Sequence, residues 1–286
     1  MSGSVVPHDV QLVVDELSKR LVPDELWALA EPLLPEFTPR PQGGGTAPVD
    51  VRAVFTAVVF VLTSGCAWRM LPPSFGVTVP TAHRRFSVWT AAGLWRRLHR
   101  AVLDELGSQG LIDWWCAVID AASVRAKKGG SMTGPSPVDR GKSGSKIHVL
   151  SDRAGIPLAV RVSAANTNDA QALKPLVQAI PAVRSRRGPR RRRPGKLHAE
   201  KAYDAAELRR WFAFRGIGVR IARKGIESGE RLGRHRWVID RTISWLTGYH
   251  RLNIRYDRKA THFLAFLTLA ATLTCYKKLV KAKSAT

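Results

Sequence analysis

Three acidic residues stand in apolar stretches of a chain that is otherwise strongly basic. Asp120 follows the letters WWCAVI, Glu200 follows KLHA, and Asp240 lies within RWVIDRTISWL. Removing a carboxylate from water is unfavourable unless a cation or hydrogen bonds compensate for it. Divalent cations prefer such oxygen ligands, and two-metal phosphoryl-transfer sites are built from carboxylates. The pattern therefore indicates a metal-dependent site; the alternative is that each acid pairs with a neighbouring arginine, Arg236 or Arg241 for example.

Short apolar runs separated by turn residues predict the strands that would carry two of these acids. The predicted strands are residues 114–124, 145–152, 156–165, 196–200 and 218–224. Short turns join the first three as in an antiparallel meander, and predicted helices alternate with the later strands, which is the order of a ribonuclease-H-like fold. Asp240 instead shares a helix face with Trp237 and Ser244, so we expect it to point where Trp237 packs rather than into open water.

The N-terminal part of the chain predicts helices. They cover residues 24–36, 50–63 and 81–106. The last mixes aromatic residues with five arginines that would face outward, Arg100 and the four candidate DNA contacts Arg84, Arg85, Arg96 and Arg97. Helices joined by short turns and ending in a basic helix suit a helix-turn-helix-like DNA-binding unit. An ordinary helical domain with solvated basic faces is the alternative.

The expected organisation is α+β, with a helical domain followed by an α/β domain. We expect a flexible N-terminus over residues 1–23, a helical DNA-binding domain over 24–108, and a ribonuclease-H-like catalytic domain over 109–282. Within the last, residues 184–196 hold eight basic residues and no acid. This segment is predicted to be a solvated, flexible loop, and phosphate-backbone contact is a compatible function for it.

Net charge limits the class of partner. With 46 Lys and Arg against 22 Asp and Glu, the chain carries a formal charge of +24, which favours nucleic acid first and an anionic membrane surface second. Three widely spaced cysteines suggest neither a metal motif nor a disulfide framework, and no secretory signal is recognised. The apolar stretches 53–63 and 263–276 are shorter than a membrane span and are predicted to be buried helices. The cysteine usage fits a reducing cytoplasm.

Four stretches resemble bacterial insertion-sequence transposases of the DDE type, closest to insertion sequence family five. In chain order they are VIDAASVRAKKGGSMTGPSPVDRGKSGSKIHVLSD, HAEKAYD, RIARKGIESGERLGRHRWVIDRTISWL and RLNIRYDRKATHFLAFLTLAA. The resemblance implies an N-terminal domain that binds the terminal repeats of the element, and a ribonuclease-H-like catalytic domain that cleaves and joins DNA. It also implies Asp120 as the first catalytic acid, two Mg²⁺ ions with Mn²⁺ able to substitute, double-stranded DNA as partner and a homo-oligomer at synapsis, without a membrane. The resemblance further implies a cytoplasmic, nucleoid-associated bacterial protein.

The second and third acids depart from the family pattern. Family members have Asp where this chain has Glu200 and Glu where it has Asp240, so the order is Asp, Glu, Asp. Arg236 fits a motif arginine, whereas Gly233 and Thr247 stand where a Tyr and a Lys would be. Because one methylene moves a carboxylate by about 1.3 to 1.5 Å and Mg²⁺ requires near-ideal geometry, we predict weakened cleavage with DNA binding kept. The alternatives are an inactive relic that only binds DNA and a basic architectural nucleic-acid-binding protein.

Several further residues surround the predicted site. Lys127, Lys128, Lys142, Lys146 and Arg236 are candidate phosphate contacts, with a solvated surface as the alternative. His148 is expected to be structural, or to reach metal-bound water or phosphate if its side of the strand faces Asp120. Asp204 is predicted to cap the following helix, or else to support the site from behind the metal ligands.

Overall fold

The computed structural model describes residues 16–36, 49–222 and 230–285, with the backbone alone for 230–235. The chain divides into two compact units, unit 1 over Met1–Leu98 and unit 2 over His99–Thr286. Most of the expected flexible N-terminus lies outside the described residues, and residues 16–21 are helical.

Unit 1 is helical in its described part. Its elements are α2 (Asp24–Ala30), η1 (Glu31–Leu33), α3 (Val51–Ser64), η2 (Trp68–Met70), η3 (Pro73–Phe75), α4 (Val79–Ala91) and the first residues of α5 (Leu94–Ser108). The Asp50 side chain caps α3 by accepting hydrogen bonds from the backbone N–H groups of Arg52 and Ala53. The core of the unit is aromatic, because the ring of Phe55 packs against those of Trp89 and Trp95.

The predicted single helix over residues 81–106 is wrong. The structure has two helices, α4 and α5, separated at Gly93, whose φ of 71° is left-handed. Glycine adopts this conformation without the steric penalty of a Cβ atom, so it ends a helix where apolar spacing alone would continue it.

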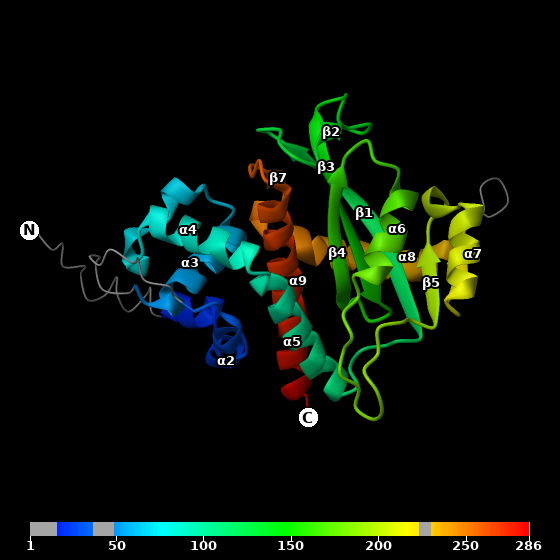
Figure 1. Ribbon diagram of the computed structural model, residues 1–286, viewed down its shortest axis with the longest axis horizontal. Coiled ribbons are helices and arrows are strands. Elements are labelled where there is room, and N and C mark those ends of the chain that lie inside the picture. Colours follow the sequence, from blue (N-terminus) through cyan, green and yellow to red (C-terminus); the bar gives the residue numbers. More distant parts are fainter. Residues whose placement is uncertain (1–15, 37–48, 223–229, 286) are drawn as a thin grey trace, which may run out of the picture. The chain divides into compact units, whose positions relative to one another are not determined.

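Seven strands form one sheet in the described part of unit 2 (Figure 1). They are β1 (Cys116–Ala126), β2 (Gly134–Pro135), β3 (Ser143–Asp152), β4 (Pro157–Ala164), β5 (Lys196–Ala199), β6 (Gly218–Ile221) and β7 (Ile254–Arg255). The path β2-β3-β1-β5-β6 is completed by β4 on β3 and β7 on β1. β3 pairs antiparallel with β1 and β4, whereas β1, β5 and β6 run parallel. The predicted meander and the two later strands are confirmed, with ends shifted by at most three residues; residues 223–224 of the last lie outside the described residues. The short turn predicted between the first two strands is wrong, because residues 127–142, which include β2, connect β1 to β3.

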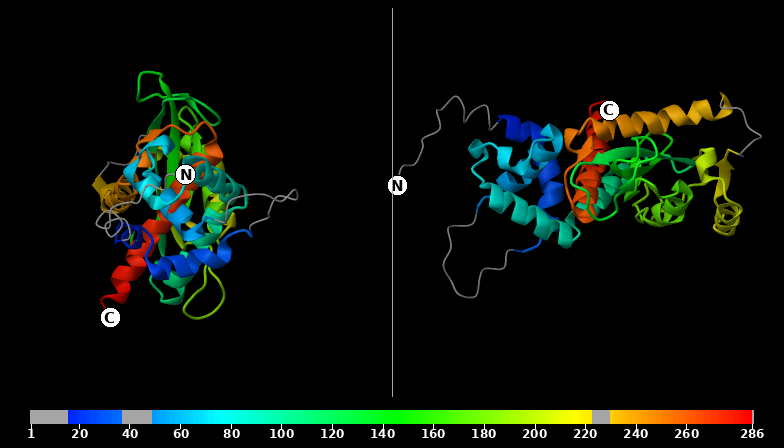
Figure 2. Two further views of the ribbon diagram at one scale, coloured as in Figure 1. Left: turned by 90° about the vertical axis from the view of Figure 1, so that its left-hand side faces the viewer. Right: turned by 90° about the horizontal axis from the view of Figure 1, so that it is seen from above.

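Helices cover both faces of this sheet. They are α6 (Asp169–Gln178), α7 (Ala206–Phe214), α8 (Glu230–Thr247) and α9 (Ala260–Lys283), with short 3-10 turns η4 (Lys201–Tyr203) and η5 (His250–Leu252). The view from above in Figure 2 shows α8 along one face of the sheet and α6 and α7 on the other. α8 packs on β1 and β3, and α9 packs along β4.

One helix in the described residues, α9, is long and apolar enough to cross a membrane. Of its most apolar 18-residue window, 78% is buried inside the protein, which is typical of a core helix. The prediction that this segment is buried is therefore confirmed, although the helix is longer than the sequence indicated.

The basic segment 184–196 is held at its base. Val183 and Arg191 exchange two backbone hydrogen bonds of 2.8 Å, which close the loop as an isolated antiparallel bridge. Asp104 of α5 accepts a hydrogen bond from the Arg184 backbone N–H at 2.7 Å and pairs with the Arg190 guanidinium at 2.8 Å. The expectation of a free solvated loop therefore misses these contacts, which the sequence does not reveal because Asp104 is remote along the chain.

Candidate active site

The parallel pairing of β1 and β5 places Asp120 and Glu200 at the same level of the sheet. Val118 of β1 is paired with His198 of β5, and each acid follows its paired residue by two positions. Side chains two positions apart point to the same face of a strand. Glu200 lies just past the end of β5 and begins the turn η4, so it stands at the carboxyl edge of the sheet.

Helix α8 brings Asp240 to the same place. Burial raises the pKa of Asp120 to about 6, while the backbone N–H of Ala121, at 2.7 Å from Oδ1, lowers it. The negative charges of Glu200 and Asp240 raise the pKa of Asp120 further. Such repulsion acts only between nearby charges. The structure therefore brings the three sequence-predicted acids together, although they come from β1, from the end of β5 and from α8.

Arg236 pairs with two of these acids. Its Nη1 lies 2.8 Å from Glu200 Oε1, and its Nε lies 3.6 Å from Asp240 Oδ2, one helical turn away. Its positive charge also lowers the pKa of Asp120. The guanidinium therefore compensates the cluster, which is the arginine pairing that the sequence left as an alternative.

The donor chemistry of the cluster suits a hard divalent cation, because carboxylate oxygens are the ligands of Mg²⁺ and Mn²⁺. As the side chains are placed, no group of three or more His, Cys, Asp and Glu residues in the described ranges could hold a metal ion. The side chains of Glu200 and Asp240 would have to turn away from Arg236 before the three carboxylates could surround a metal ion.

Two matches with known families cover most of the chain. Residues 22–99 match the family described as "Putative transposase of IS4/5 family", and residues 115–275 match the family "Transposase DDE domain". The second match spans more than half of the chain. The chain belongs to the DDE transposase family.

Individual relatives agree with this assignment. The transposase is 43% identical over 150 residues to the "Putative transposase for insertion sequence element IS402" of Burkholderia cepacia, which covers 52% of this chain and 71% of the relative. It is 42% identical over 123 residues to the 16.2 kDa protein of the same element, covering 42% of this chain and 84% of that protein. The piggyBac transposase of a synaptic complex with hairpin DNA has a similar fold, with a TM-score of 0.51 at 8% identity over 96% of this chain and 76% of that one. The expected α+β class with a ribonuclease-H-like domain is thus confirmed.

The prediction that Asp240 of this transposase points to a place where Trp237 packs, rather than into open water, is wrong. Trp237 is 53% exposed and stacks on Arg241, whose guanidinium carbon lies 4.3 Å from the ring centre. The Asp240 side chain is likewise 52% exposed. The residues of α8 that face the sheet are instead Val238, Ile239, Thr242 and Leu246, all buried. An arginine partner thus allows a tryptophan to lie on the surface, which apolar spacing does not predict.

His148 lies on the opposite face of the sheet from Asp120. Asp120 is paired with Val149, and His148, next to Val149, therefore points the other way. Its Nε2 lies 2.8 Å from Ser163 Oγ, and burial lowers its pKa to about 4. His148 is thus buried and bonded to Ser163, as expected for a structural histidine, and the alternative in which its side of the strand faces Asp120 is wrong.

Asp204 does not cap the helix that follows it. The N-cap residue of α7 is Ala205, and no side chain caps it. Asp204 Oδ1 instead accepts hydrogen bonds from Arg209 Nε at 3.0 Å and Nη2 at 2.8 Å. Arg209 also donates to the backbone carbonyl of Ile221, so the pair ties α7 to β6.

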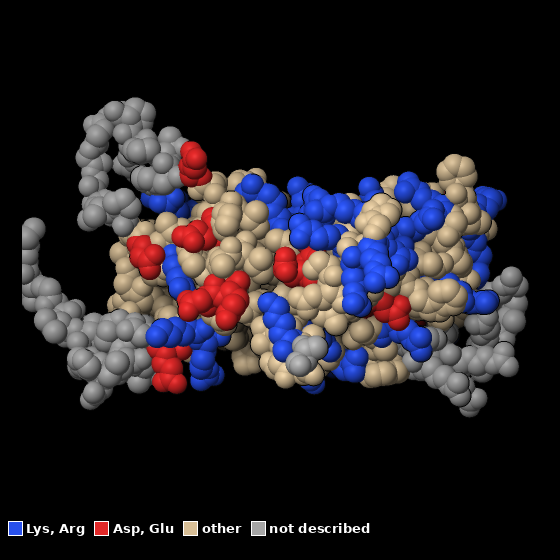
Figure 3. Space-filling model, turned by 90° about the horizontal axis from the view of Figure 1, so that it is seen from below, with Lys and Arg blue, Asp and Glu red and all other residues tan. Residues whose placement is uncertain are grey.

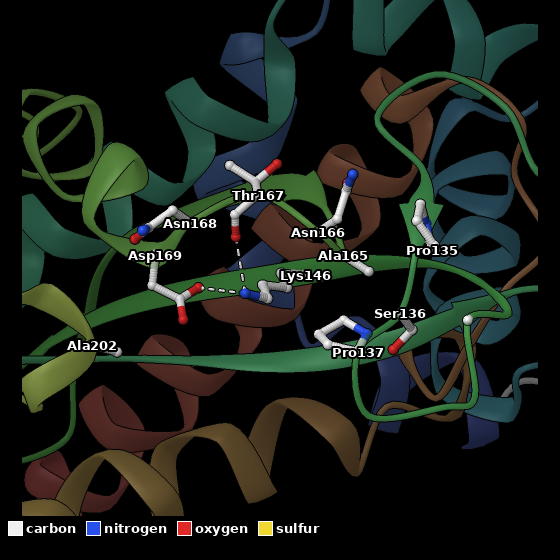
Figure 4. Close-up of a pocket in the computed structure, with 11 residues that line it drawn as sticks. Pro135, Ser136, Pro137, Lys146, Ala165, Asn166, Thr167, Asn168, Asp169 and Ala202 are labelled. Carbon is white, nitrogen blue, oxygen red and sulfur yellow. Dashed lines mark hydrogen bonds and ion pairs between the residues drawn. The ribbon is translucent and has the colours of Figure 1, made fainter.

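Lys146, a predicted phosphate contact, is already held by two groups of the protein. Its Nζ donates to Asp169 Oδ1 at 2.9 Å and to the carbonyl of Thr167 at 3.0 Å (Figure 4). It lines a cavity of about 690 Å³ that extends to Ala202, two residues after Glu200. Lys127, Lys128 and Lys142 are exposed.

The four arginines predicted for DNA binding lie in unit 1. Arg84, Arg96 and Arg97 are exposed, and Arg97 donates a hydrogen bond of 2.8 Å to the carbonyl of Leu33. Arg85 is half-buried, and burial followed by the charge of Arg84 lowers its pKa.

One positioning residue was missed from the sequence. Arg255 is fully buried and donates to the carbonyls of Ser131, Met132, Asp257 and Arg258 and to the hydroxyl of Ser145. It thereby holds the turn that follows β1, where Lys127 and Lys128 are exposed. The only indication of this role in the sequence was an arginine between Ile and Tyr in the stretch NIRYD, residues 253–257.

Proposed function

We propose that this transposase cuts and joins duplex DNA at the cluster of Asp120, Glu200 and Asp240. The observation that carries the proposal is the convergence of Asp120 from the middle of β1, Glu200 from the carboxyl end of β5 and Asp240 from α8, with burial and the charges of the other two acids raising the pKa of Asp120. Three carboxylates gathered this closely repel one another, and a site that binds a cation gains from that repulsion.

The proposed cofactor is a pair of Mg²⁺ ions, with Mn²⁺ able to substitute. Asp120, from the centre of the sheet, would hold both ions, and Glu200 and Asp240 would hold one each. Such ions supply Lewis-acid stabilisation and lower the pKa of water or of a DNA 3′-hydroxyl. Arg236, which pairs with Glu200 and Asp240 in this structure, would have to release both carboxylates for them to hold cations.

The proposed substrates are the ends of the insertion element and its target DNA. One matched relative is the putative transposase of insertion sequence element IS402, and the structurally similar piggyBac protein was seen in a synaptic complex with hairpin DNA. Unit 1, with Arg84, Arg96 and Arg97 exposed, is proposed to bind the terminal repeats. Bringing two ends together would require a homo-oligomer.

The test is nicking of a plasmid that carries the terminal repeats, with Mg²⁺ or Mn²⁺ and with EDTA as control. Cation-dependent nicks at the repeat ends are expected, and Asp120→Asn should abolish them while leaving DNA binding intact. Nicking that persists in Asp120→Asn would place the chemistry elsewhere.

The exchanged acids predict impaired rather than full activity. One ligand is longer by a methylene and the other shorter than in the family pattern, and a displacement of about 1 Å can reduce a rate on the order of a hundredfold. We expect the double variant Glu200→Asp with Asp240→Glu to nick repeat DNA at least tenfold faster than the natural chain. Each single variant serves as a control, and an unchanged rate in the double variant contradicts this explanation.

A DNA-binding relic without cleavage is the second candidate. The ion pairs of Arg236 with Glu200 and Asp240 favour it, because they satisfy two of the three acids without a metal. Absence of nicking in both the natural chain and the reverted double variant would support this candidate.

A further inference from the structure

A second positive surface lies at the other end of the sheet from the acids. The loop of residues 184–195 leads into the first residue of β5, whereas Glu200 follows its last residue. Four residue steps at about 3.3 Å each separate Lys196 from Glu200, so this surface begins roughly 13 Å from the acid cluster along the strand. Figure 1 shows the loop and the β2 hairpin projecting from opposite ends of the sheet.

The cations of this surface are held in place without being neutralised. Arg193 Nη1 donates to the carbonyl of Arg215 at 2.8 Å, and Arg192 Nη2 donates to the carbonyl of Gln178 at 3.4 Å. These bonds fix the guanidinium groups but leave their charge uncompensated. In the part of the chain that the structure describes, Arg190 is the one residue of the loop that forms an ion pair, with Asp104.

Adjacent residues extend the positive surface. Arg186 and Arg187 are exposed at the tip of the loop. At its base Trp115 is 61% exposed, and Lys196 Nζ lies 4.2 Å from the centre of its ring. Figure 3, viewed from below, shows Lys and Arg side chains gathered on the face of unit 2 from which the loop projects. We name this surface the loop patch, consisting of Arg186, Arg187, Arg192, Arg193, Lys196 and Trp115.

We propose that the loop patch binds the phosphate backbone of a duplex DNA segment other than the one cut at the acids. The proposal rests on the proposed function for its choice of DNA as the polyanion. Preoriented guanidinium groups match phosphate oxygens, and like-charged side chains gathered at one surface repel each other unless an anion joins them. The acids beside the loop patch are already held, Asp104 by Arg190 and Asp113 by the backbone N–H of Trp115. Because the patch begins roughly 13 Å along the strand from Glu200, it holds either the continuation of the same duplex or a separate duplex.

The test compares two variants that remove the same charge. Arg186→Gln with Arg187→Gln alters the loop patch, and Lys281→Gln with Lys283→Gln removes two charges from the exposed end of α9. Fluorescence anisotropy of the full chain would measure binding to labelled duplexes of about 15 and 40 base pairs across a salt series. EDTA is present throughout, so that cleavage plays no part.

Each phosphate contact adds about 0.9 to the slope of log affinity against log salt. We expect the arginine variant to show a slope less steep by roughly 2 than the natural chain, and the lysine variant to keep the natural slope. If the arginine variant loses affinity only for the long duplex, the loop patch holds the continuation of the duplex that is cut. If it loses a second binding event on the short duplex, the loop patch holds a separate duplex.

Equal slopes for the natural chain and the arginine variant on both duplexes overturn the proposal. An equal loss of slope in the lysine variant also overturns it, because the loss would then depend only on the net charge of the protein. The catalytic proposal fails separately, through nicking by Asp120→Asn. If the natural chain binds neither duplex, DNA is not its partner, and both the proposed function and the proposed role of the loop patch are wrong.

Discussion

At the residue scale, the guanidinium of Arg236 makes the cluster of acids compatible with a folded protein before any cation binds. It contacts Glu200 at 2.8 Å and Asp240 at 3.6 Å, and its charge lowers the pKa of Asp120. The types and positions of the three acids could be predicted from the sequence, because an acid in an apolar stretch of a basic chain is conspicuous. Which of several nearby arginines would compensate them could not, because Glu200 and Arg236 are 36 positions apart.

Arg236→Gln tests this role directly. Removing the positive charge leaves Glu200 and Asp240 to act on Asp120 without compensation, so the pKa of Asp120 should rise above its value of about 6. Carboxyl-carbon NMR titration of the metal-free protein measures this pKa. Arg236→Lys keeps the charge and should keep most of the natural value; an unaltered pKa in Arg236→Gln would show that the guanidinium does not act on Asp120.

At the element scale, apolar runs predicted the strands of unit 2 and failed where one glycine sets the boundary. β1, β3 and β4 alternate with clear turn signals, so their order and the meander follow from local sequence. The two-residue strands β2 and β7 depend on contacts with remote segments, such as those of buried Arg255, and leave no periodic trace. Between α4 and α5 the aromatic pattern continues through Gly93, and only its left-handed φ of 71° separates the two helices.

Gly93→Ala should therefore destabilise unit 1. The nearest atom to an added Cβ is Arg96 Nη2 at 3.8 Å, so the strain is conformational rather than steric. A left-handed alanine costs about 1 to 2 kcal/mol, which should lower the midpoint of thermal unfolding by several degrees. Gly93→Asn is the matched control, because asparagine tolerates this conformation better; calorimetry that finds the alanine variant as stable as the natural chain contradicts the assignment of the break to Gly93.

At the scale of the whole molecule, net charge and motif order predicted a nucleic-acid enzyme with two parts, but not how buried ionisable groups balance each other. In unit 2, burial lowers the pKa of His99 to about 4 and raises that of Asp152 to about 6. Neither effect follows from sequence, because the burial that causes it is produced by folding. Hydrogen bonds oppose both shifts: the carbonyl of Pro157, 2.9 Å from His99 Nε2, raises the pKa of His99, and the backbone N–H groups of Asp113 and Ile156, which donate to Asp152, lower the pKa of Asp152.

These two groups should give stability opposite dependences on pH. His99 is lowered from 6.5, so its contribution is present above about pH 6.5 and is lost as pH falls toward 4. Asp152 is raised from 3.8, so its contribution is present below about pH 4 and is lost as pH rises through 6. Each shift corresponds to about 2 kcal/mol between pH 7 and pH 4.5. Urea unfolding at these two pH values should show that, relative to the natural chain, Asp152→Asn loses about 2 kcal/mol more on acidification and His99→Gln about 2 kcal/mol less. Parallel responses of the two variants would show that these side chains do not titrate as buried groups, because opposite signs follow directly from their opposite pKa shifts.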